Sequence, residues 1–309
     1  MRNLLSTEDF TRKNLEALFS LSDDIKNNKL KYVNSLKGKI IATLFYEPST
    51  RTRLSFESAI IQLGAKFLST ENARENSSAW KGESIEDTVR TLEGYCDAIV
   101  IRNSEEDSIT KAARVSSVPI INAGNGSEEH PTQAILDLYT IKELKSTLDG
   151  ISIAIMGDLK HGRTAHSLIK LLSLYNNITV YGFGIVGFEL PQKYIDFLNN
   201  KNIKFIKCNS FDDIPKSIDI VYQTRVQKER MVDKTIPIKE FCIDKNALDK
   251  LSKQSYIMHP LPRGIEIHPE IDNDSRAAYF KQAHNGIFTR MALLLTIMEN
   301  ININEIKAI

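Results

Sequence analysis

Cysteine is scarce in this chain, and its distribution argues against two common uses of the residue. Cys96, Cys208 and Cys242 are odd in number, far apart in sequence and outside any metal-ligand spacing. We therefore expect buried thiols in a reducing compartment rather than disulfide bonds or a zinc site. The six histidines form no H-x-x-x-H pair and no cluster with cysteine, so the sequence predicts neither a metal nor an organic cofactor.

The chain also lacks an excess of charge and any long apolar run. Its 40 basic and 39 acidic residues leave a net charge of +1, which gives no reason to expect a nucleic-acid or membrane partner. No apolar run reaches the length of a membrane span and no signal sequence is visible, so we expect a cytoplasmic protein. With 309 residues, 42% of them hydrophobic, the chain is long enough for two ordinary domains.

Apolar runs of strand length alternate with amphipathic stretches along the whole chain. This alternation predicts an α/β fold with two doubly wound parallel-sheet domains joined by helices. The expected strands lie at residues 40–45, 65–68, 98–101, 119–122, 151–156, 178–181, 204–207, 218–222 and 256–258. The expected helices lie at residues 9–27, 50–63, 85–95, 108–116, 132–145, 164–174, 191–199, 245–251 and 286–299.

Residues 46–53, with the sequence YEPSTRTR, form the most informative turn of the chain. They lie between an apolar strand and a helical segment, and the first turn of a helix presents unpaired N–H groups and the positive end of its dipole. Hydroxyls and a guanidinium at such a turn suit a phosphate group. No G-x-x-x-x-G-K-[ST] loop occurs, which excludes a Walker site. The alternative is an ordinary helix cap with surface arginines.

Other polar groups follow the carboxyl ends of the expected strands. They are Arg102, residues 122–126, Arg163, Thr224–Arg225 and residues 259–263. Open parallel sheets bind ligands at that edge, and unrelated surface arginines have no reason to gather there. One cleft between the two domains could collect all of these groups.

Four blocks resemble the transcarbamoylase family, in the expected order. They are S-T-R-T at 49–52, H-P-T-Q at 130–133, T-R-V-Q-K-E-R at 224–230 and H-P-L-P-R at 259–263. The last two are similar to the aspartate-specific branch, whereas the S-M-G motif and the His-Cys-Leu-Pro segment of the ornithine branch are absent. The resemblance extends from residue 4 to about residue 300.

The resemblance implies a reaction and a division of labour. The reaction is transfer of the carbamoyl group from carbamoyl phosphate to L-aspartate, the committed step of pyrimidine biosynthesis. Residues 1–133 would bind carbamoyl phosphate and residues 134–286 would bind aspartate, with the active site in the cleft between the domains. The carboxyl-terminal helix, at 287–309, would pack back on the first domain. The alternatives are a transcarbamoylase for another amine, such as ornithine, and a non-enzymatic relative.

On the donor side, the resemblance implies a phosphate site and a set of groups that stabilise an oxyanion. The phosphate site would be formed by Ser49, Thr50, Arg51 and Thr52. Thr52, Arg102 and His130 would stabilise the negative charge that develops on the carbamoyl oxygen. Gln133 would bind the carbamoyl NH2 group. The alternatives are a strand-end salt bridge for Arg102 and a helix-capping role for His130.

On the acceptor side, a dicarboxylate amine requires cationic partners. The resemblance implies Arg163 and Arg225, with Gln227, because guanidinium groups pair with carboxylates through two hydrogen bonds. The backbone carbonyl of Leu261 would orient the reacting groups in a rigid frame with Pro262. A cis peptide bond between these two residues is expected from the family.

Ser77 and Lys81 belong to a polar segment that resembles a loop which an adjacent subunit inserts into the active site. Ser77 would then contact carbamoyl phosphate, and Lys81 would serve binding and catalysis, in a homotrimer with shared active sites. The alternative is an ordinary polar loop. The sequence leaves open whether a separate regulatory chain exists.

Three positions depart from the family pattern without removing a proposed catalytic group. His161 stands where relatives often have tyrosine. Trp80 stands before Lys81, where a smaller or polar residue is usual, and residues 264–265 are Gly-Ile where Val-Asp is common.

Overall fold

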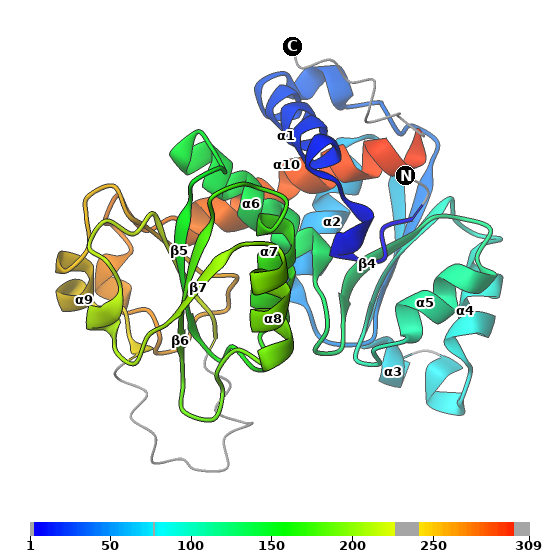
Figure 1. The fold of residues 1–309 in the computed structure, drawn as a ribbon. Helices are drawn as coiled ribbons and strands as arrows, with labels where there is room; N and C mark the ends of the chain where they lie inside the picture. Colours follow the sequence, from blue (N-terminus) through cyan, green and yellow to red (C-terminus); the bar gives the residue numbers. More distant parts are fainter. Residues whose placement is uncertain (1–2, 77, 226–240, 300–309) are drawn as a thin grey trace. The chain divides into compact units, whose positions relative to one another are not determined.

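The computed structural model describes residues 3–76, 78–225 and 241–299. The chain divides into two compact units. The first unit comprises Met1–Leu136 and His284–Ile309, and the second comprises Asp137–Ala283. The chain passes between them within α6 (Pro131–Lys145) and again within α10 (Tyr279–Met298) (Figure 1).

The first unit is built on a parallel sheet with the strand order β2-β1-β3-β4. Its strands are β1 (Ile40–Phe45), β2 (Lys66–Glu71), β3 (Ala98–Asn103) and β4 (Ile120–Asn125). β1 and β3 are almost continuously buried, as expected for central strands of a parallel sheet that is covered on both faces. β2 lies at an edge of the sheet and is mostly exposed or half-buried.

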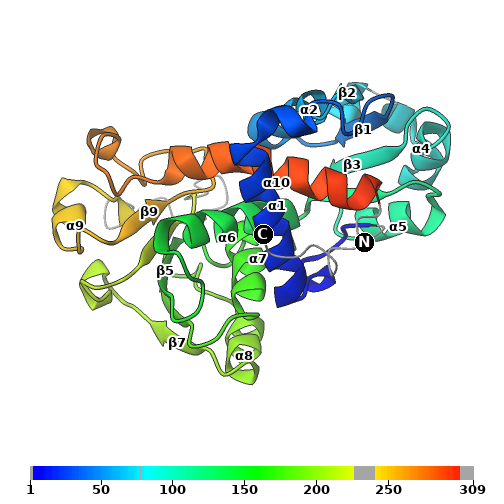
Figure 2. The same cartoon turned by 90° about the horizontal axis from the view of Figure 1, so that it is seen from above.

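The helices of the first unit cover this sheet. They are η1 (Thr7–Asp9), α1 (Arg12–Asn27), η2 (Lys29–Tyr32), α2 (Thr50–Gln62), α3 (Ala73–Asn76), η3 (Ser78–Lys81), α4 (Ile85–Leu92) and α5 (Ser108–Val115). α4 and α5 lie side by side, with α5 against β3 and β4 (Figures 1 and 2). The part of α10 within this unit packs on α2, where Arg290 lies over the ring of Phe56 at 5.0 Å.

The second unit is built on a parallel sheet with the strand order β7-β6-β5-β8-β9. Its strands are β5 (Ser152–Gly157), β6 (Thr179–Gly184), β7 (Lys204–Lys207), β8 (Ile220–Gln223) and β9 (Tyr256–Met258). Its shorter helical segments are α7 (Arg163–Leu172), α8 (Gln192–Asn200), η4 (Phe211–Asp213), α9 (Lys245–Asp249) and η7 (Pro269–Ile271). A core that includes Met156, Val221 and Ile257 joins the strands.

The α/β class with two parallel sheets is confirmed, whereas several element boundaries differ from the expectations. The first helical stretch begins with a separate short turn capped by Ser6, and α1 begins only at Arg12. α10 begins at Tyr279 instead of 286. Its first turns were missed because Gln282 is buried although it is polar, and its hydrogen-bond partners are distant in sequence. The polar segment after β2 forms α3 and η3 rather than a plain loop.

Two further expectations from composition concern the cysteines and the absence of membrane-spanning segments. All three cysteines are free; Cys96 and Cys208 are buried as expected, but Cys242 is only half-buried. Among the residues that the structure describes, no helix is both long enough and apolar enough to cross a bilayer.

Candidate active site

The start of α2 presents anion-binding groups directly after β1. Ser49 occupies the N-cap position, and its side chain makes no capping hydrogen bond. Arg51 is exposed, and its guanidinium makes no hydrogen bond or ion pair within the described part of the chain. Neighbouring atoms displace part of its water and lower its pKa, but the group stays charged because its ordinary pKa is far above neutrality. Unpaired N–H groups, hydroxyls and a cation therefore meet at the positive end of a helix.

Thr52 and His130 meet beside this turn. Thr52 Oγ1 lies 3.4 Å from His130 Nε2, and both side chains are buried. His130 immediately precedes α6, and its carbonyl oxygen accepts the backbone N–H groups of Gln133 and Ala134. The backbone of His130 thus belongs to the start of α6, while its ring contacts Thr52 in the turn formed by residues 46–53, the phosphate-type turn. Gln133, one turn into α6, is also buried.

Arg102 lies level with the end of β1, because it pairs in register with Phe45. Its Nε donates to Glu47 Oε2 at 3.0 Å, and its carbonyl oxygen accepts the N–H of Tyr46 at 2.9 Å. The strand-end salt bridge is thus present. It ties the Arg102 guanidinium to Glu47, which lies just before Ser49 in the segment that follows β1. The sequence did not identify Glu47 as the partner.

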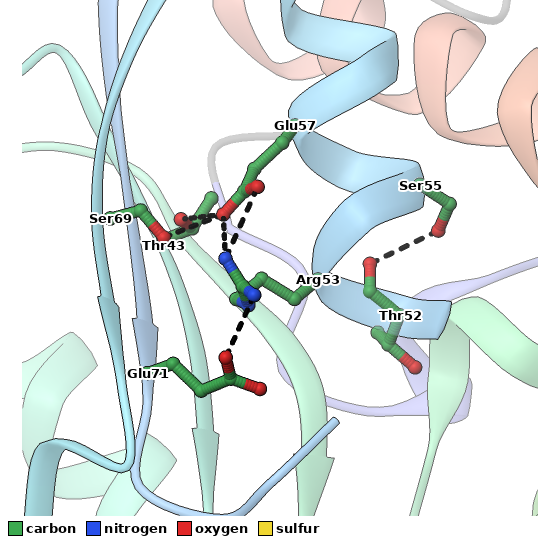
Figure 3. Close-up of polar contacts among 7 residues, drawn as sticks. All are labelled: Thr43, Thr52, Arg53, Ser55, Glu57, Ser69 and Glu71. Carbon is green, nitrogen blue, oxygen red and sulfur yellow. Dashed lines mark hydrogen bonds and ion pairs between the residues drawn. The ribbon is translucent and has the colours of Figure 1, made fainter. Parts of the chain in front are cut away.

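Arg53 faces away from Arg51, although both belong to the same short run. Figure 3 shows its guanidinium between Glu57 and Glu71, on the side of α2 opposite to Thr52 and Ser55. Its Nη1 lies 3.1 Å from Glu57 Oε1, and its Nη2 lies 2.8 Å from Glu71 Oε2. Glu57 also accepts hydrogen bonds from Thr43 (3.2 Å) and Ser69 (2.5 Å). Arg53 and Glu57 together therefore anchor α2 to β1 and β2.

In the second unit, the carboxyl ends of β5 and β8 are tied together. Thr224, just after β8, donates its hydroxyl to the carbonyl of Met156 at 2.8 Å. A Cβ on Gly157, which has a φ of +107°, would lie 2.6 Å from that hydroxyl, so only glycine fits. Because β5 and β8 are neighbours, this contact fixes the strand ends that lead to Arg163 and to Arg225.

Arg163 opens α7 after a short turn. The buried carboxylate of Asp158 organises this turn: its Oδ1 accepts the backbone N–H of His161 at 2.9 Å, and its Oδ2 lies 3.3 Å from His161 Nδ1. His161, one of the departures from the family pattern, thus lies two residues from Arg163 and contacts the carboxylate that shapes the turn. Asp158 was not among the predicted site residues.

Arg225 is exposed just beyond β8, as expected for a group that meets a ligand. Two other predicted site residues, Ser77 and Gln227, lie outside the described residues. Lys81 ends η3 and is exposed, next to Trp80, the only tryptophan of the chain.

Leu261 follows β9 in a constrained backbone. It has a φ of +59°, and its peptide bond to Pro262 is cis, as expected. Its N–H donates to His259 Nδ1 at 2.8 Å, so Nε2 of this buried ring carries the proton and donates to Glu266 Oε1 at 3.2 Å. Burial raises the pKa of Glu266, but the hydrogen bonds from His259 and from the backbone of Gly264 outweigh this effect and lower the pKa overall.

Arg263, the last residue of the same block, makes internal contacts. It pairs with both carboxylate oxygens of Asp272 and donates to the hydroxyl of Tyr279 at 3.2 Å. The hydrogen bonds from Arg263 lower the pKa of Asp272 to about 2. This arginine thus anchors the loop after β9 to the start of α10.

Over residues 3–76, 78–225 and 241–299, no group of three or more His, Cys, Asp or Glu side chains is arranged to hold a metal ion. The residues at or after the carboxyl ends of β1, β3 and β4 and those after β5 and β8 form two half-sites, which present cations, hydroxyls and one imidazole. The first half-site suits a phosphate and a developing oxyanion, and the second suits carboxylates.

Comparisons with known proteins agree with both halves. The carbamoyl-phosphate-binding domain of the aspartate/ornithine carbamoyltransferases matches residues 2–143, and their Asp/Orn-binding domain matches residues 149–297. The aspartate carbamoyltransferase catalytic subunit of Clostridium novyi is 45% identical over 96% of this chain and 98% of its own length.

Solved structures are similar over the same extent. The catalytic subunit of M. jannaschii aspartate transcarbamoylase has a TM-score of 0.91 at 43% identity, covering 97% of this chain and 99% of that one. Aspartate transcarbamoylase of Trypanosoma cruzi, solved with carbamoyl phosphate and aspartate, has a TM-score of 0.90 at 37% identity, covering 96% and 95%. The Trypanosoma cruzi enzyme has also been solved with N-(phosphonacetyl)-L-aspartic acid.

Proposed function

Because the chain belongs to the aspartate/ornithine carbamoyltransferase family, we propose that it transfers the carbamoyl group of carbamoyl phosphate to the amino group of L-aspartate. The first unit binds carbamoyl phosphate and the second binds aspartate. The observation that carries the proposal is the start of α2, where the cation of Arg51 lies one residue from the Thr52–His130 pair. A phosphate and the carbonyl attached to it need this combination of charge and hydrogen-bond donors.

On the donor side, the helix start and the side chains of Ser49, Thr50 and Arg51 hold the phosphate. When the aspartate nitrogen bonds to the carbamoyl carbon, negative charge develops on the carbonyl oxygen. Thr52, Arg102 and His130 stabilise that charge, and the bond between the carbamoyl carbon and the phosphate oxygen then breaks. Gln133 and the backbone at Leu261–Pro262 bind the carbamoyl NH2 group.

On the acceptor side, Arg163 and Arg225 bind the two carboxylates of aspartate, and Gln227 assists them. Two guanidinium groups would repel the side-chain cation of ornithine, so they favour a dicarboxylate acceptor. The family models cover both acceptors, whereas the similar proteins described above are aspartate enzymes.

The proposal includes a homotrimer in which Ser77 and Lys81 complete the active site of an adjacent subunit. Large apolar side chains on the first unit support an assembly: Leu54 and Ile61 are exposed two turns apart on α2, and Leu68 is exposed on the edge strand β2. Exposed apolar groups of this kind are typical of surfaces that another chain covers. Closed cyclic symmetry would give every site one copy of each contribution.

We place the enzyme in a reducing compartment, the cytoplasm. All three cysteines are free thiols, and burial raises the pKa of Cys208 to about 11, which keeps it in the unreactive thiol form. The Clostridium novyi relative is called a catalytic subunit, so a separate regulatory chain is included in the proposal as an optional partner. Sizing the purified chain with and without candidate partners would test both parts of the assembly.

The decisive experiment is an assay of the purified chain with carbamoyl phosphate and either L-aspartate or L-ornithine, in parallel. We expect carbamoyl-aspartate and phosphate to form in equal amounts and ornithine to give no product. Turnover of ornithine alone would assign the chain to the other acceptor class. Failure of both acceptors, with a folded protein and binding of neither substrate, would refute the enzymatic assignment.

A further inference from the structure

A continuous series of buried hydrogen bonds runs through the second unit. It connects β8, α6, α10 and the loop after β9 through the side chains of Tyr222, Asp137, Gln282 and His259. Each of these four residues is at most 1% exposed. His259 belongs to the block 259–263 that the sequence predicts at the ligand-binding edge, whereas the other three were not predicted there.

Each group in the series has one role that its neighbour imposes. The backbone N–H of His259 can only donate, so Gln282 turns Oε1 toward it, at 2.8 Å. The amide nitrogen of Gln282 then donates to Asp137 Oδ1 at 2.6 Å, and the hydroxyl of Tyr222 donates to Oδ2 at 2.7 Å. The two carboxylate oxygens of Asp137 therefore accept hydrogen bonds from two different elements, β8 and α10.

One end of the series is close in sequence to the groups assigned to the acceptor, and the other end is close to Leu261, which is assigned to the carbamoyl group. Tyr222 is three residues before Arg225, and it is also hydrogen-bonded to Thr164, the residue after Arg163. At the other end, His259 Nδ1 accepts the N–H of Leu261 at 2.8 Å. The series thus joins the three backbone segments that carry Arg163, Arg225 and Leu261.

Burial makes the series sensitive to the loss of any one partner. Burial raises the pKa of Tyr222 well above its ordinary value, so its hydroxyl remains a donor. Removing one donor takes a hydrogen bond away from a buried carboxylate oxygen, which favours a shift of the surrounding backbone or the entry of water. A shift of the strand end or of the loop moves the groups that hold the substrate.

We propose that Asp137 is a positioning residue for the acceptor: by accepting the hydrogen bond of Tyr222 it holds Arg163 and Arg225 in the geometry that aspartate requires. The inference rests on the proposed function and extends it to a residue that contacts no substrate. A purely structural role would affect stability without distinguishing the two substrates.

The test uses the full chain with Tyr222→Phe, Gln282→Met and Asp137→Asn. The control is Ser255→Ala, which removes another buried hydroxyl of the second unit; Ser255 donates to Ile218 before β8, at the opposite end of the sheet. Steady-state kinetics give the KM for each substrate. Calorimetry gives the Kd for carbamoyl phosphate and for N-(phosphonacetyl)-L-aspartic acid, and thermal unfolding gives Tm.

We expect the three variants to raise the KM for aspartate, or the Kd of the phosphonacetyl compound, by about 10- to 100-fold. In Tyr222→Phe, which changes only the end of the series near Arg163 and Arg225, the Kd for carbamoyl phosphate should stay within about twofold, and Ser255→Ala should change Tm alone. Tyr222→Phe removes only the hydroxyl oxygen. If the other variants do not fold, its kinetic constants alone test the positioning role.

An unchanged KM for aspartate in Tyr222→Phe, or an equal loss of affinity for both substrates, would overturn the positioning role while leaving the proposed function intact. A wild-type chain that forms no carbamoyl-aspartate and does not bind the phosphonacetyl compound would overturn the proposed function, and the positioning role with it.

Discussion

At the scale of single residues, Arg51 and Arg53 show how one motif serves two purposes. Residues two apart on a helix point in nearly opposite directions, because each residue turns the helix by about 100°. Arg51 therefore remains exposed at the helix start, whereas Arg53 reaches Glu57 and Glu71 (Figure 3). The same side chain at two positions of one short run is thus exposed in one case and anchors the helix in the other.

Arg51→Ala should nearly abolish turnover of carbamoyl phosphate and leave the fold intact. Loss of one charge-assisted phosphate contact costs about 2–4 kcal/mol, or roughly thirty- to thousand-fold in catalytic efficiency. Steady-state kinetics and Tm measure the two effects. A variant with near-normal efficiency would refute the phosphate assignment.

Arg225→Ala should raise the KM for aspartate far more than the KM for carbamoyl phosphate. The reason is that Arg225 belongs to the second unit, whereas the phosphate-type turn belongs to the first. The two constants are measured by varying one substrate at a time. Equal increases in both would show that the division of labour between the units is wrong.

At the scale of elements, α2 depends on its ion pairs for its position on the sheet. Glu57 is buried and accepts from Arg53, Thr43 and Ser69, which come from α2, β1 and β2. A buried carboxylate that loses its cation is left with an uncompensated charge. The orientation of the phosphate-type turn at the start of α2 follows from this anchoring.

Arg53→Ala should lower the free energy of unfolding by about 2–4 kcal/mol, because it leaves Glu57 without its cation. Urea unfolding measures the change. Lys111→Ala, which breaks an exposed pair with Asp107 on α5, serves as the control and should have little effect. Equal stability of the two variants would argue against the anchoring role.

The loop after β9 is anchored to α10 in a pH-dependent way. Because the pKa of Asp272 is lowered to about 2 in the folded chain, the carboxylate stabilises the fold above its unfolded-state pKa of about 4. This contribution disappears as the pH falls through the folded-state value. Arg263, its partner, stays charged throughout that range.

Asp272→Asn should therefore destabilise the chain at neutral pH, and its difference from the wild type should shrink between about pH 4 and pH 2. Unfolding by urea at several pH values checks this. Asp196→Asn, which changes an exposed carboxylate on α8, is the control and should show no such trend. A difference that grows toward low pH would contradict the sign of the pKa shift.

At the scale of the whole molecule, the proposed sharing of active sites between subunits predicts complementation between two inactive variants. Arg51→Ala and Lys81→Ala should each inactivate every site of a homotrimer, since each site needs one residue from either chain. When the two variants are dissociated, mixed and reassembled at random, about a quarter of the interfaces should regain both intact residues. Activity is assayed before and after mixing.

Each variant reassembled alone provides the control, and sizing must show trimers in every sample. No recovery in confirmed trimers would place Lys81 in the site of its own chain or outside any site. A fully active monomer would rule out shared sites altogether.

The sequence by itself determined the fold class and the edge at which the polar groups gather, because both follow from local patterns. Apolar periodicity specifies strands and helices, and parallel strands bring their carboxyl ends to one edge. Only the tertiary structure decided which arginine anchors α2, which carboxylate shapes the turn before Arg163, and that Asp137 accepts from Tyr222 and Gln282. Those last partners are 85 and 145 residues away in sequence, and no local pattern encodes a contact that depends on how distant elements pack.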